Sequence, residues 1–197
     1  LNYVKKFCDT NNIKYTIEEG VEDVRRIDLK DVRGFIKSLK PKSQGKSLKI
    51  RSYQVEAVQL AVSRNRALLV SPTASGKSLI IYIILRWHQQ FERKQLIVVP
   101  TTSLVEQLYT DFQDYAKNDT WQASYNCYRI YGTVSKTNDM PVTISTWQSI
   151  HRLPKTFFSE FKAVYGDECH LFKAKSLTTI MNKCYTYNFY SSSSSSS

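Results

Sequence analysis

The sequence contains the stretch Ser71-Pro72-Thr73-Ala74-Ser75-Gly76-Lys77-Ser78 between two apolar runs, residues 67–70 and 79–85. The runs predict a strand before the stretch and a helix after it. Gly76 lets the backbone approach a phosphate, and the free N–H groups of the following helix point at the anion. Lys77 can reach the β- and γ-phosphates, and the Ser78 hydroxyl can ligate Mg²⁺. The stretch therefore predicts a phosphate-binding loop, with Ser71 in place of the usual first glycine. Taken alone, it also fits a kinase, a GTPase or a chance match.

The composition is that of a globular protein with a polyanionic partner. The 197 residues are 42% apolar and 13% aromatic, and their net charge is +11. Residues 1–51 hold 13 Lys and Arg against 7 Asp and Glu, which is more than half of the excess. The charge favours nucleic acid over a membrane, because the sequence shows no amphipathic basic helix or long apolar span. Surface charge for solubility is the alternative interpretation.

The four cysteines are scattered along the chain and show no C-x-x-C spacing. This pattern is typical of reduced, intracellular thiols. Cys169 and His170 are adjacent, and adjacent side chains on a strand or turn diverge. Zinc is therefore not expected.

The first 46 residues predict a small basic α/β domain followed by a linker. A helix is expected to begin after Asp28 as its N-cap, with one apolar face that contains Leu29, Val32, Phe35, Ile36 and Leu39. Residues 41–47 break the periodicity, which is typical of a linker. DNA contact through phosphates is favoured for this domain, and a packing domain with a solvated charged face is the alternative. The candidate phosphate contacts are Lys5, Lys6, Arg25, Arg26, Arg33 and Lys37.

Residues 47–190 predict an α/β domain with a parallel sheet covered by helices on both faces. Continuous apolar runs favour strands, and the stretches between them favour helices. The expected strands are 67–70, 95–99, 142–145 and 162–166, with a further one at 185–190. The expected helices are 53–63, 79–90, 103–116, one near 147 and one after 173. Residues 191–197 are seven serines, from which no packed element is expected.

Two acidic residues, Asp167 and Glu168, follow the expected strand 162–166. Hydrolysis of a phosphoanhydride needs a cation to gather charge and a base to orient water. Asp167 is expected to hold Mg²⁺, and Glu168 to orient or deprotonate the attacking water. An ordinary exposed acidic turn is the alternative, but ligands bind at the carboxyl ends of parallel strands, where the phosphate loop is also expected.

These motifs together resemble those of superfamily 2 helicases. Residues 71–78 resemble motif I, and Asp167-Glu168-Cys169-His170 resembles motif II, a variant of the DEAD/DEAH box. Three further matches follow the order of the family: Arg51-Ser52-Tyr53-Gln54, Val99-Pro100-Thr101-Thr102, and Thr146-Trp147-Gln148-Ser149. Residues 143–148, with motif II, look most like the UvsW-type helicases of T4-like bacteriophages. The resemblance implies a RecA-like P-loop domain that hydrolyses ATP with Mg²⁺ and moves on branched DNA.

The resemblance also implies a role for each matching residue. Contacts to ATP are expected from Tyr53, Gln54, Thr73, Ala74, Ser75, Gly76, Lys77 and Ser78. Catalysis is expected from Lys77, Asp167, Glu168 and His170, with Ser78 and Asp167 as metal ligands. The DNA strand is expected to contact Pro100, Thr101, Thr146 and Gln148.

The implied partners are DNA, with RNA in hybrids, and a second RecA-like domain outside this chain that carries the arginines of motif VI. The implied location is intracellular, in the host cytoplasm if a phage encodes the protein. Two alternatives remain. One is a double-stranded DNA translocase that does not separate strands, and the other is a nucleic-acid-binding module with a vestigial ATP site.

Overall fold

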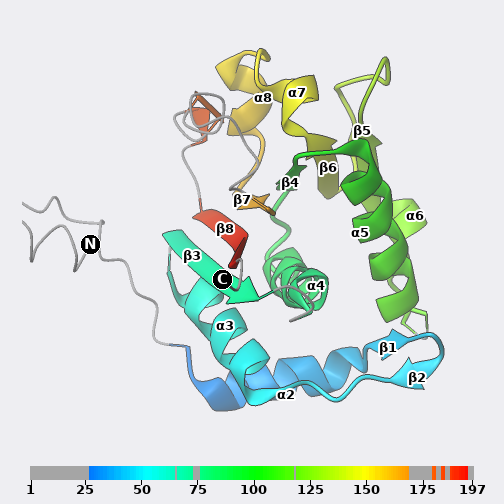
Figure 1. Cartoon of the computed structure of the whole chain (residues 1–197), viewed down its shortest axis with the longest axis vertical. Helices are drawn as coiled ribbons and strands as arrows, with labels where there is room; N and C mark the ends of the chain where they lie inside the picture. Colours follow the sequence, from blue (N-terminus) through cyan, green and yellow to red (C-terminus); the bar gives the residue numbers. More distant parts are fainter. Residues whose placement is uncertain are drawn as a thin grey trace, which may run out of the picture.

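The computed structural model describes residues 27–64, 66–72, 76–117, 119–168, 179–180, 183–184 and 187–194, and for 66–72 and 187–194 it describes the backbone alone. Helices and strands alternate along most of this length (Figure 1). They are α2 (Leu29–Leu39), β1 (Lys42–Ser43), β2 (Lys46–Ser47), α3 (Ser52–Ser63), β3 (Arg66–Pro72), α4 (Lys77–Gln89), β4 (Gln95–Val99), α5 (Thr102–Tyr115), α6 (Ala123–Asn126), β5 (Cys127–Ile130), β6 (Val142–Thr146), α7 (Trp147–Ile150), α8 (Lys155–Ser159), β7 (Ala163–Gly166) and β8 (Tyr187–Ser194). The expected α/β class is confirmed.

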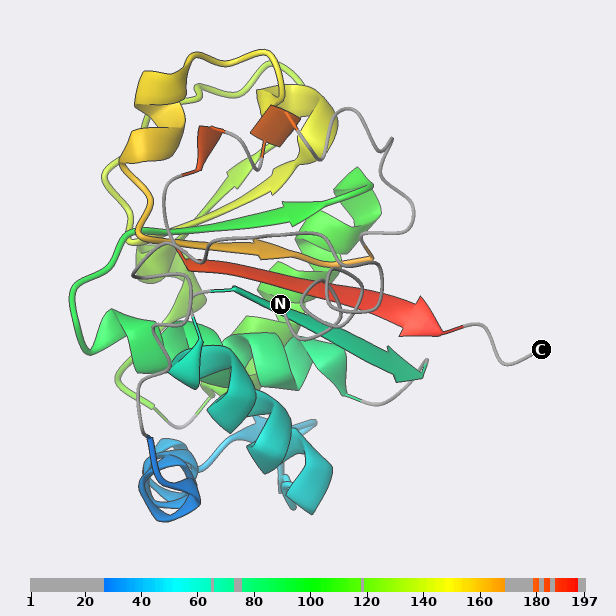
Figure 2. The same cartoon turned by 90° about the vertical axis from the view of Figure 1, so that its left-hand side faces the viewer.

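The main sheet has six strands in the order β3-β8-β7-β4-β6-β5, and every pairing is parallel. Figure 2 shows the long strands pointing the same way. Parallel pairing brings the carboxyl ends of all the strands to one edge of the sheet, where ligands bind in folds of this kind. The predicted parallel sheet is therefore confirmed, and that edge is the place to look for a site.

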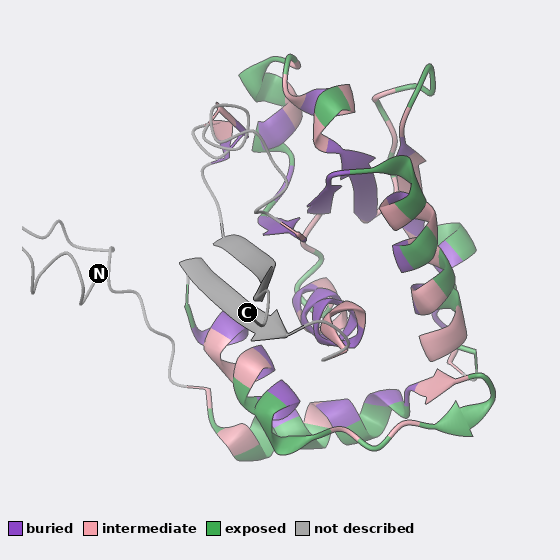
Figure 3. Ribbon diagram, in the orientation of Figure 1, coloured by how far each residue is buried: buried purple, intermediate pink, exposed green. Residues whose placement is uncertain are grey.

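The strand β4 shows how the sheet separates two hydrophobic cores. Its five residues are all buried, and successive side chains point to opposite faces. Ile97 and Val99 join the larger core, which contains α3, α4 and α5. Leu96 and Val98 join the smaller core, with Ile150 of α7 and Phe158 of α8. Figure 3 shows this burial in the middle of the sheet. Burial on both faces explains why the strand sequence is apolar without alternation.

Helix α4 is apolar on all sides because it is enclosed on all sides. Residues 79–85 are all buried, and the helix packs between α3 and α5. Its four isoleucines are poor helix formers in isolation, so packing rather than propensity holds this helix. Among the described residues, no helix is both long and apolar enough to cross a bilayer.

Helix α2 begins after Asp28, as predicted, and buries the predicted face. Val32, Ile36 and Leu39 belong to the larger core, and the ring of Phe35 meets Trp87 of α4 edge to face at 5.1 Å between centroids. The side chain of Asp28 makes no capping hydrogen bond. Because α2 shares its core with α3 and α4, a separate small domain is not confirmed for residues 27–46. Residues 1–26 lie outside the described residues.

Residues 42–47 form a hairpin, so the prediction of a linker at 41–47 is wrong there. Gln44 and Gly45 both take positive φ, 50° and 79°, as a tight turn between antiparallel strands requires. The backbone N–H of Gln44 donates to Asp114 Oδ2 of α5 at 2.8 Å. The hairpin is stabilised by this turn and by contact with α5 rather than by apolar periodicity, which is why the sequence pattern did not reveal it.

The strand β8 begins at Tyr187 and continues through Ser194, between β3 and β7. The predicted strand at 185–190 is thus confirmed from residue 187 onward. The expectation that the serines build no packed element is wrong for residues 191–194, which pair with residues 69–72 of β3. Strand pairing uses backbone N–H and C=O groups, which every serine carries.

Candidate active site at the carboxyl edge of the sheet

The phosphate-binding stretch lies at the carboxyl edge, between the end of β3 and the start of α4. Gly76 is the residue just before α4, with a φ of 77° in the left-handed region that suits glycine. Lys77 and Ser78 are the first two residues of the helix. The order of strand, loop and helix is therefore as predicted, and the free N–H groups of the first turn face the loop. Thr73, Ala74 and Ser75 lie outside the described residues, so their roles stay predictions.

Lys77 and Glu168 meet at this edge although 91 positions separate them in the sequence. Lys77 Nζ lies 2.7 Å from Glu168 Oε1, and the two side chains are 12% and 19% exposed. A half-buried ion pair of this kind is costly to break on one side only, because the remaining charge then lacks its partner. A charged group that enters the site can replace either member of the pair at lower cost, because the remaining member then keeps a partner of opposite charge.

The turn after β7 holds both acidic residues in place. Asp167 is buried, its N–H donates to Val98 O of β4 at 3.0 Å, and its Oδ1 accepts the N–H of Glu168 at 3.0 Å. Glu168 adopts a φ of 50°, which is uncommon for a residue with a Cβ and typical of functional sites. The ordinary exposed acidic turn, the alternative interpretation, does not describe these residues.

Gln54 reaches the phosphate loop from α3. It is 5% exposed, and its Oε1 accepts the backbone N–H of Arg51 at 3.0 Å. A Cβ placed on Gly76 would lie 2.5 Å from Gln54 Nε2, so the amide and the loop are in close contact. Tyr53, the other residue expected at adenine, is 38% exposed, and its hydroxyl accepts a hydrogen bond from Arg51 at 3.3 Å.

The residues present fit a magnesium ion of the kind that accompanies nucleotides. Mg²⁺ usually takes one or two protein oxygens and completes its shell with water and substrate phosphates. The Ser78 hydroxyl adjoins Lys77, and the buried Asp167 carboxylate adjoins Glu168, so the Lys77–Glu168 contact joins the two segments that carry these oxygens. No cluster of three or more His, Cys, Asp or Glu suited to a metal occurs among the described residues.

The four residues expected along a DNA strand lie at the ends of two neighbouring strands, β4 and β6. Gln148 is exposed, and its Nε2 donates to Pro100 O at 3.1 Å. Thr101 is exposed and caps α5, with its Oγ1 accepting the N–H of Leu104 at 3.3 Å. Thr146 is buried, and its hydroxyl pairs with that of Ser149 at 2.9 Å. The structure thus brings the four together, with Thr101 and Gln148 presenting side chains to solvent.

Five further predicted residues lie outside the described residues: His170, Lys5, Lys6, Arg25 and Arg26. Their roles stay predictions. Arg33 and Lys37 are described, and both are exposed on α2. The DNA-contact hypothesis therefore rests, in structural terms, on α2.

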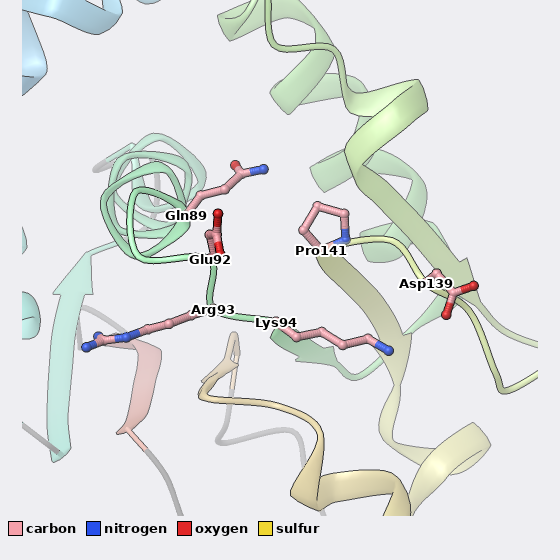
Figure 4. A pocket seen from close by; sticks show the side chains of 6 residues that line it. All are labelled: Gln89, Glu92, Arg93, Lys94, Asp139 and Pro141. Carbon is pink, nitrogen blue, oxygen red and sulfur yellow. The ribbon is translucent and has the colours of Figure 1, made fainter.

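Two hollows in the described surface lie away from the catalytic pair. One, of ≈ 410 Å³, adjoins the amino ends of β4 and β6, at the opposite edge of the sheet. It is lined by Gln89, Glu92, Arg93, Lys94, Asp139 and Pro141, and Figure 4 shows Arg93 and Lys94 extending in opposite directions. The other, of ≈ 510 Å³, lies between α2 and the start of α3, with Arg33, Lys37 and Lys40 among its lining residues.

The sequence matches a family model described as the res subunit of type III restriction enzymes, over residues 47–190. The chain belongs to this family. A curated relative, the ATP-dependent DNA helicase uvsW of Enterobacteria phage T4, is 35% identical over 189 residues. That alignment covers 92% of this chain and 37% of the relative, so the chain spans little more than a third of that protein's length.

Solved structures agree with the family assignment. The crystal structure of the UvsW helicase from bacteriophage T4 has a TM-score of 0.87 and 33% identity, covering 98% of this chain and 70% of that chain. The SWI2/SNF2 ATPase core of Sulfolobus solfataricus in complex with dsDNA has a TM-score of 0.61 over 76% of this chain, with 14% identity. The second likeness shows the fold alone. The RecA-like fold and the resemblance to superfamily 2 and UvsW-type helicases are confirmed.

Two residues near the site were missed by the sequence analysis. The hydroxyl of Tyr115, in the last turn of α5, lies 2.8 Å from Ser78 Oγ, and Asp111, one turn earlier, is close enough for the Ser78 hydroxyl to affect the pKa of its carboxyl. The sequence did contain one signal for them. Asp111 and Tyr115 are four positions apart, so they lie on the same face of the helix, and Phe112, which follows Asp111, is buried. The pattern alone does not say which element those two side chains face.

The contact between Gly76 and Gln54 leads to the first prediction. Replacing Gly76→Ala adds a Cβ 2.5 Å from an amide nitrogen at a φ of 77°. We expect the free energy of unfolding to fall by about 1–3 kcal/mol from backbone strain alone, as measured by chemical denaturation. The double variant Gly76→Ala/Gln54→Ala should lose less than the sum of the single variants, because the clash is gone.

Gly34→Ala supplies the matched control. Gly34 lies in α2, and nothing stands within 4 Å of an added Cβ, so this change should be neutral or stabilising by up to about 1 kcal/mol. Equal stabilities for the Gly76→Ala and Gly34→Ala variants would contradict the close approach of loop and amide.

Proposed function

We propose that this chain is the nucleotide-binding part of an ATP-dependent DNA helicase. The observation that carries the proposal is the contact of Lys77 with Glu168 at the carboxyl edge of the parallel sheet. The membership of the family and the likeness to the T4 helicase support it. ATP is the expected substrate, with Mg²⁺ as its companion ion.

The proposed chemistry begins with a change of partner for Lys77. The oxygens of an entering triphosphate compete with Glu168 for the ammonium group, and they carry more negative charge than one carboxylate. Lys77 then binds the β- and γ-phosphates, and Glu168 is released to accept a proton from the attacking water. In the free protein the ion pair with Lys77 neutralises the charge of Glu168, so Glu168 becomes available as a base only after the nucleotide has bound.

The other residues of the site position the nucleotide. Ser78 and Asp167 would hold Mg²⁺, which neutralises charge on the phosphates when it is bound. Gln54, which lies beside Gly76, is proposed to read the adenine base with its amide, and the more exposed Tyr53 is proposed to contact the same base. His170 is proposed to couple this site to the DNA strand, as the resemblance implies. The arginines that complete hydrolysis are proposed to come from a second RecA-like domain outside this chain.

DNA is proposed to lie across the ends of β4 and β6, against Pro100, Thr101, Thr146 and Gln148. Closure of two RecA-like domains on ATP would grip the strand, and opening after hydrolysis would move it. The resemblance to UvsW-type proteins leads us to propose branched DNA as substrate, with RNA in hybrids, inside the host cell. Exposed Lys30, Arg33 and Lys37 on α2, with Lys40 at its C-cap, would add sequence-independent contacts to phosphates.

Replacing Lys77→Ala tests the ATPase directly. We expect DNA-stimulated ATP hydrolysis by the full-length protein to fall by at least about 100-fold, since charge stabilisation of this kind contributes that much. Lys94→Ala is the matched control, because Lys94 also forms a 2.7 Å ion pair, with Glu160, but at the opposite edge of the sheet. Undiminished turnover in the Lys77→Ala protein would refute the proposed motor.

The substrate can be tested by strand-separation assays. The full-length protein should open forked and junction-containing duplexes in an ATP-dependent way, faster than linear duplexes of equal length. Movement on duplex DNA is measured separately with a triplex, because a protein that moves along the duplex displaces the third strand. Displacement of that strand without any opening of forks would instead favour a double-stranded translocase.

The basic surface of α2 predicts a strong salt dependence of DNA binding. The double variant Arg33→Ala/Lys37→Ala should bind DNA more weakly, and the slope of log K against log salt should shrink by about 2, near one unit per lost phosphate contact. The control Lys155→Ala/Lys162→Ala removes the same charge from exposed positions in α8 and just before β7, and α8 packs on the other face of the sheet. Equal slopes for both double variants, measured by fluorescence anisotropy, would exclude contact through α2.

A further inference from the structure

The hydroxyl of Ser78 is held by a neighbouring helix. Its Oγ lies 2.8 Å from the phenolic oxygen of Tyr115, which is the last residue of α5. Asp111 stands one turn earlier on the same face of that helix, close enough for the Ser78 hydroxyl to affect the pKa of its carboxyl. The residue proposed to ligate Mg²⁺ therefore has two polar neighbours, one of them a hydrogen-bond partner, that belong neither to the phosphate loop nor to the acidic turn.

The single proton and two lone pairs of a hydroxyl limit which hydrogen bonds Ser78 can make while its oxygen also ligates a cation. Ser78 Oγ has one proton and two lone pairs, and a lone pair must face the cation if the oxygen is a ligand. The proton must then point away, toward an acceptor. The Asp111 carboxylate, one turn from Tyr115, is the nearby anion that can become that acceptor when a cation binds, and Tyr115 can donate its own proton to the second lone pair. One lone pair is left, and its direction is fixed by the other two bonds.

Tyr115 is itself held by packing, so its hydroxyl is a fixed reference point. Its ring lies against Tyr82 of α4, with 5.5 Å between centroids. The hydroxyl of Tyr82 accepts a hydrogen bond from Arg86 at 2.7 Å, and Arg86 pairs with Asp119 at 2.6 Å. Partners outside the ligand shell that fix the orientation of a ligand in this way raise the affinity of a metal site.

We propose that Tyr115 and Asp111 are positioning residues, which orient the Ser78 hydroxyl so that its free lone pair faces the metal ion of a bound nucleotide. The inference rests on the proposed function, because it assumes that Ser78 meets Mg²⁺–nucleotide. Neither residue touches the nucleotide. Burial raises the pKa of Asp111, and the nearby Ser78 hydroxyl offsets part of this rise.

The test measures metal binding rather than turnover. Mn²⁺ replaces Mg²⁺ as the probe, and the loss of its free electron paramagnetic resonance signal is followed in the full-length protein with saturating ADP. The variants are Tyr115→Phe, Asp111→Asn and the double variant Tyr115→Phe/Asp111→Ala. The matched control is Tyr109→Phe on the same helix, where the ring lies under Arg129 at 4.0 Å and away from Ser78.

We expect the Kd of Mn²⁺ to rise several-fold in the Tyr115→Phe protein and by about 10–100-fold in the double variant, the usual range for such partners. The affinity for ADP in the presence of EDTA should stay within about twofold of the wild type, because the phosphate loop is unchanged. The Tyr109→Phe protein should match the wild type in both measurements. Asp111→Asn, which keeps an accepting oxygen, should fall between the wild type and the double variant.

Each other outcome overturns a specific claim. Unchanged Mn²⁺ affinity in all three variants would overturn the positioning role. An equal loss of ADP affinity with and without metal would also overturn it, since the helix would then support the loop in general. Thermal melting identifies any variant that fails to fold. In that case the Mn²⁺ affinity of the Asp111→Asn protein, in which one oxygen is replaced by an NH₂ group, tests the positioning role. A wild-type protein that binds no Mn²⁺ with ADP would instead refute the proposed function.

Discussion

The contact of Lys77 with Glu168 depends on the parallel pairing of the sheet. Lys77 follows β3 and Glu168 follows β7, and β8 lies between these two strands. In a parallel sheet the chain leaves every strand at the same edge, so residues 91 positions apart arrive together. An antiparallel pairing of either strand would send its acidic or basic residue to the opposite edge. The site is therefore a consequence of topology before it is a consequence of any one motif.

The position of Lys77 is also fixed by the burial of α4, the helix that carries it. Residues 79–85 of α4 are all buried between the sheet and its neighbouring helices, so the helix can present polar groups only at its ends. Its first turn holds Lys77 and Ser78 at the carboxyl edge. At the other end, the buried His88 makes a 2.7 Å hydrogen bond with Arg93. Burial of the middle thus fixes where the reactive first turn lies.

The sequence predicted those parts of the fold in which burial determines composition. The strands β4, β6 and β7 are buried along their whole length, residues 79–85 of α4 form one apolar run, and all four elements lie within one or two residues of the predicted limits. The edge strand β5 was missed because Tyr128 and Arg129, its middle residues, are only half-buried. An edge strand has one neighbour and needs less apolar surface, so its composition does not distinguish it from a loop.

Other features were unpredictable because they depend on the backbone or on distant contacts. The strand β8 passes into the serine run because pairing with β3 uses main-chain groups that carry no sequence signal. The motif residues Lys77, Gln54 and Asp167 were found because phosphate chemistry restricts residue types at short spacing. The link from Ser78 to Tyr115 joins positions 37 apart on two helices, and only the packing of α4 against α5 determines it.

Helix α5 connects the two sides of the proposed motor as a single rigid element. It begins with Thr101 as its cap, beside Pro100 and the ends of β4 and β6. At its other end, Asp114 binds the hairpin through the N–H of Gln44, and Tyr115 reaches Ser78. A helix of 14 residues bends little over its length of about 21 Å. The orientation of the Ser78 hydroxyl is therefore tied to the position of α5, whose start is set by the strand end at which DNA is proposed to bind.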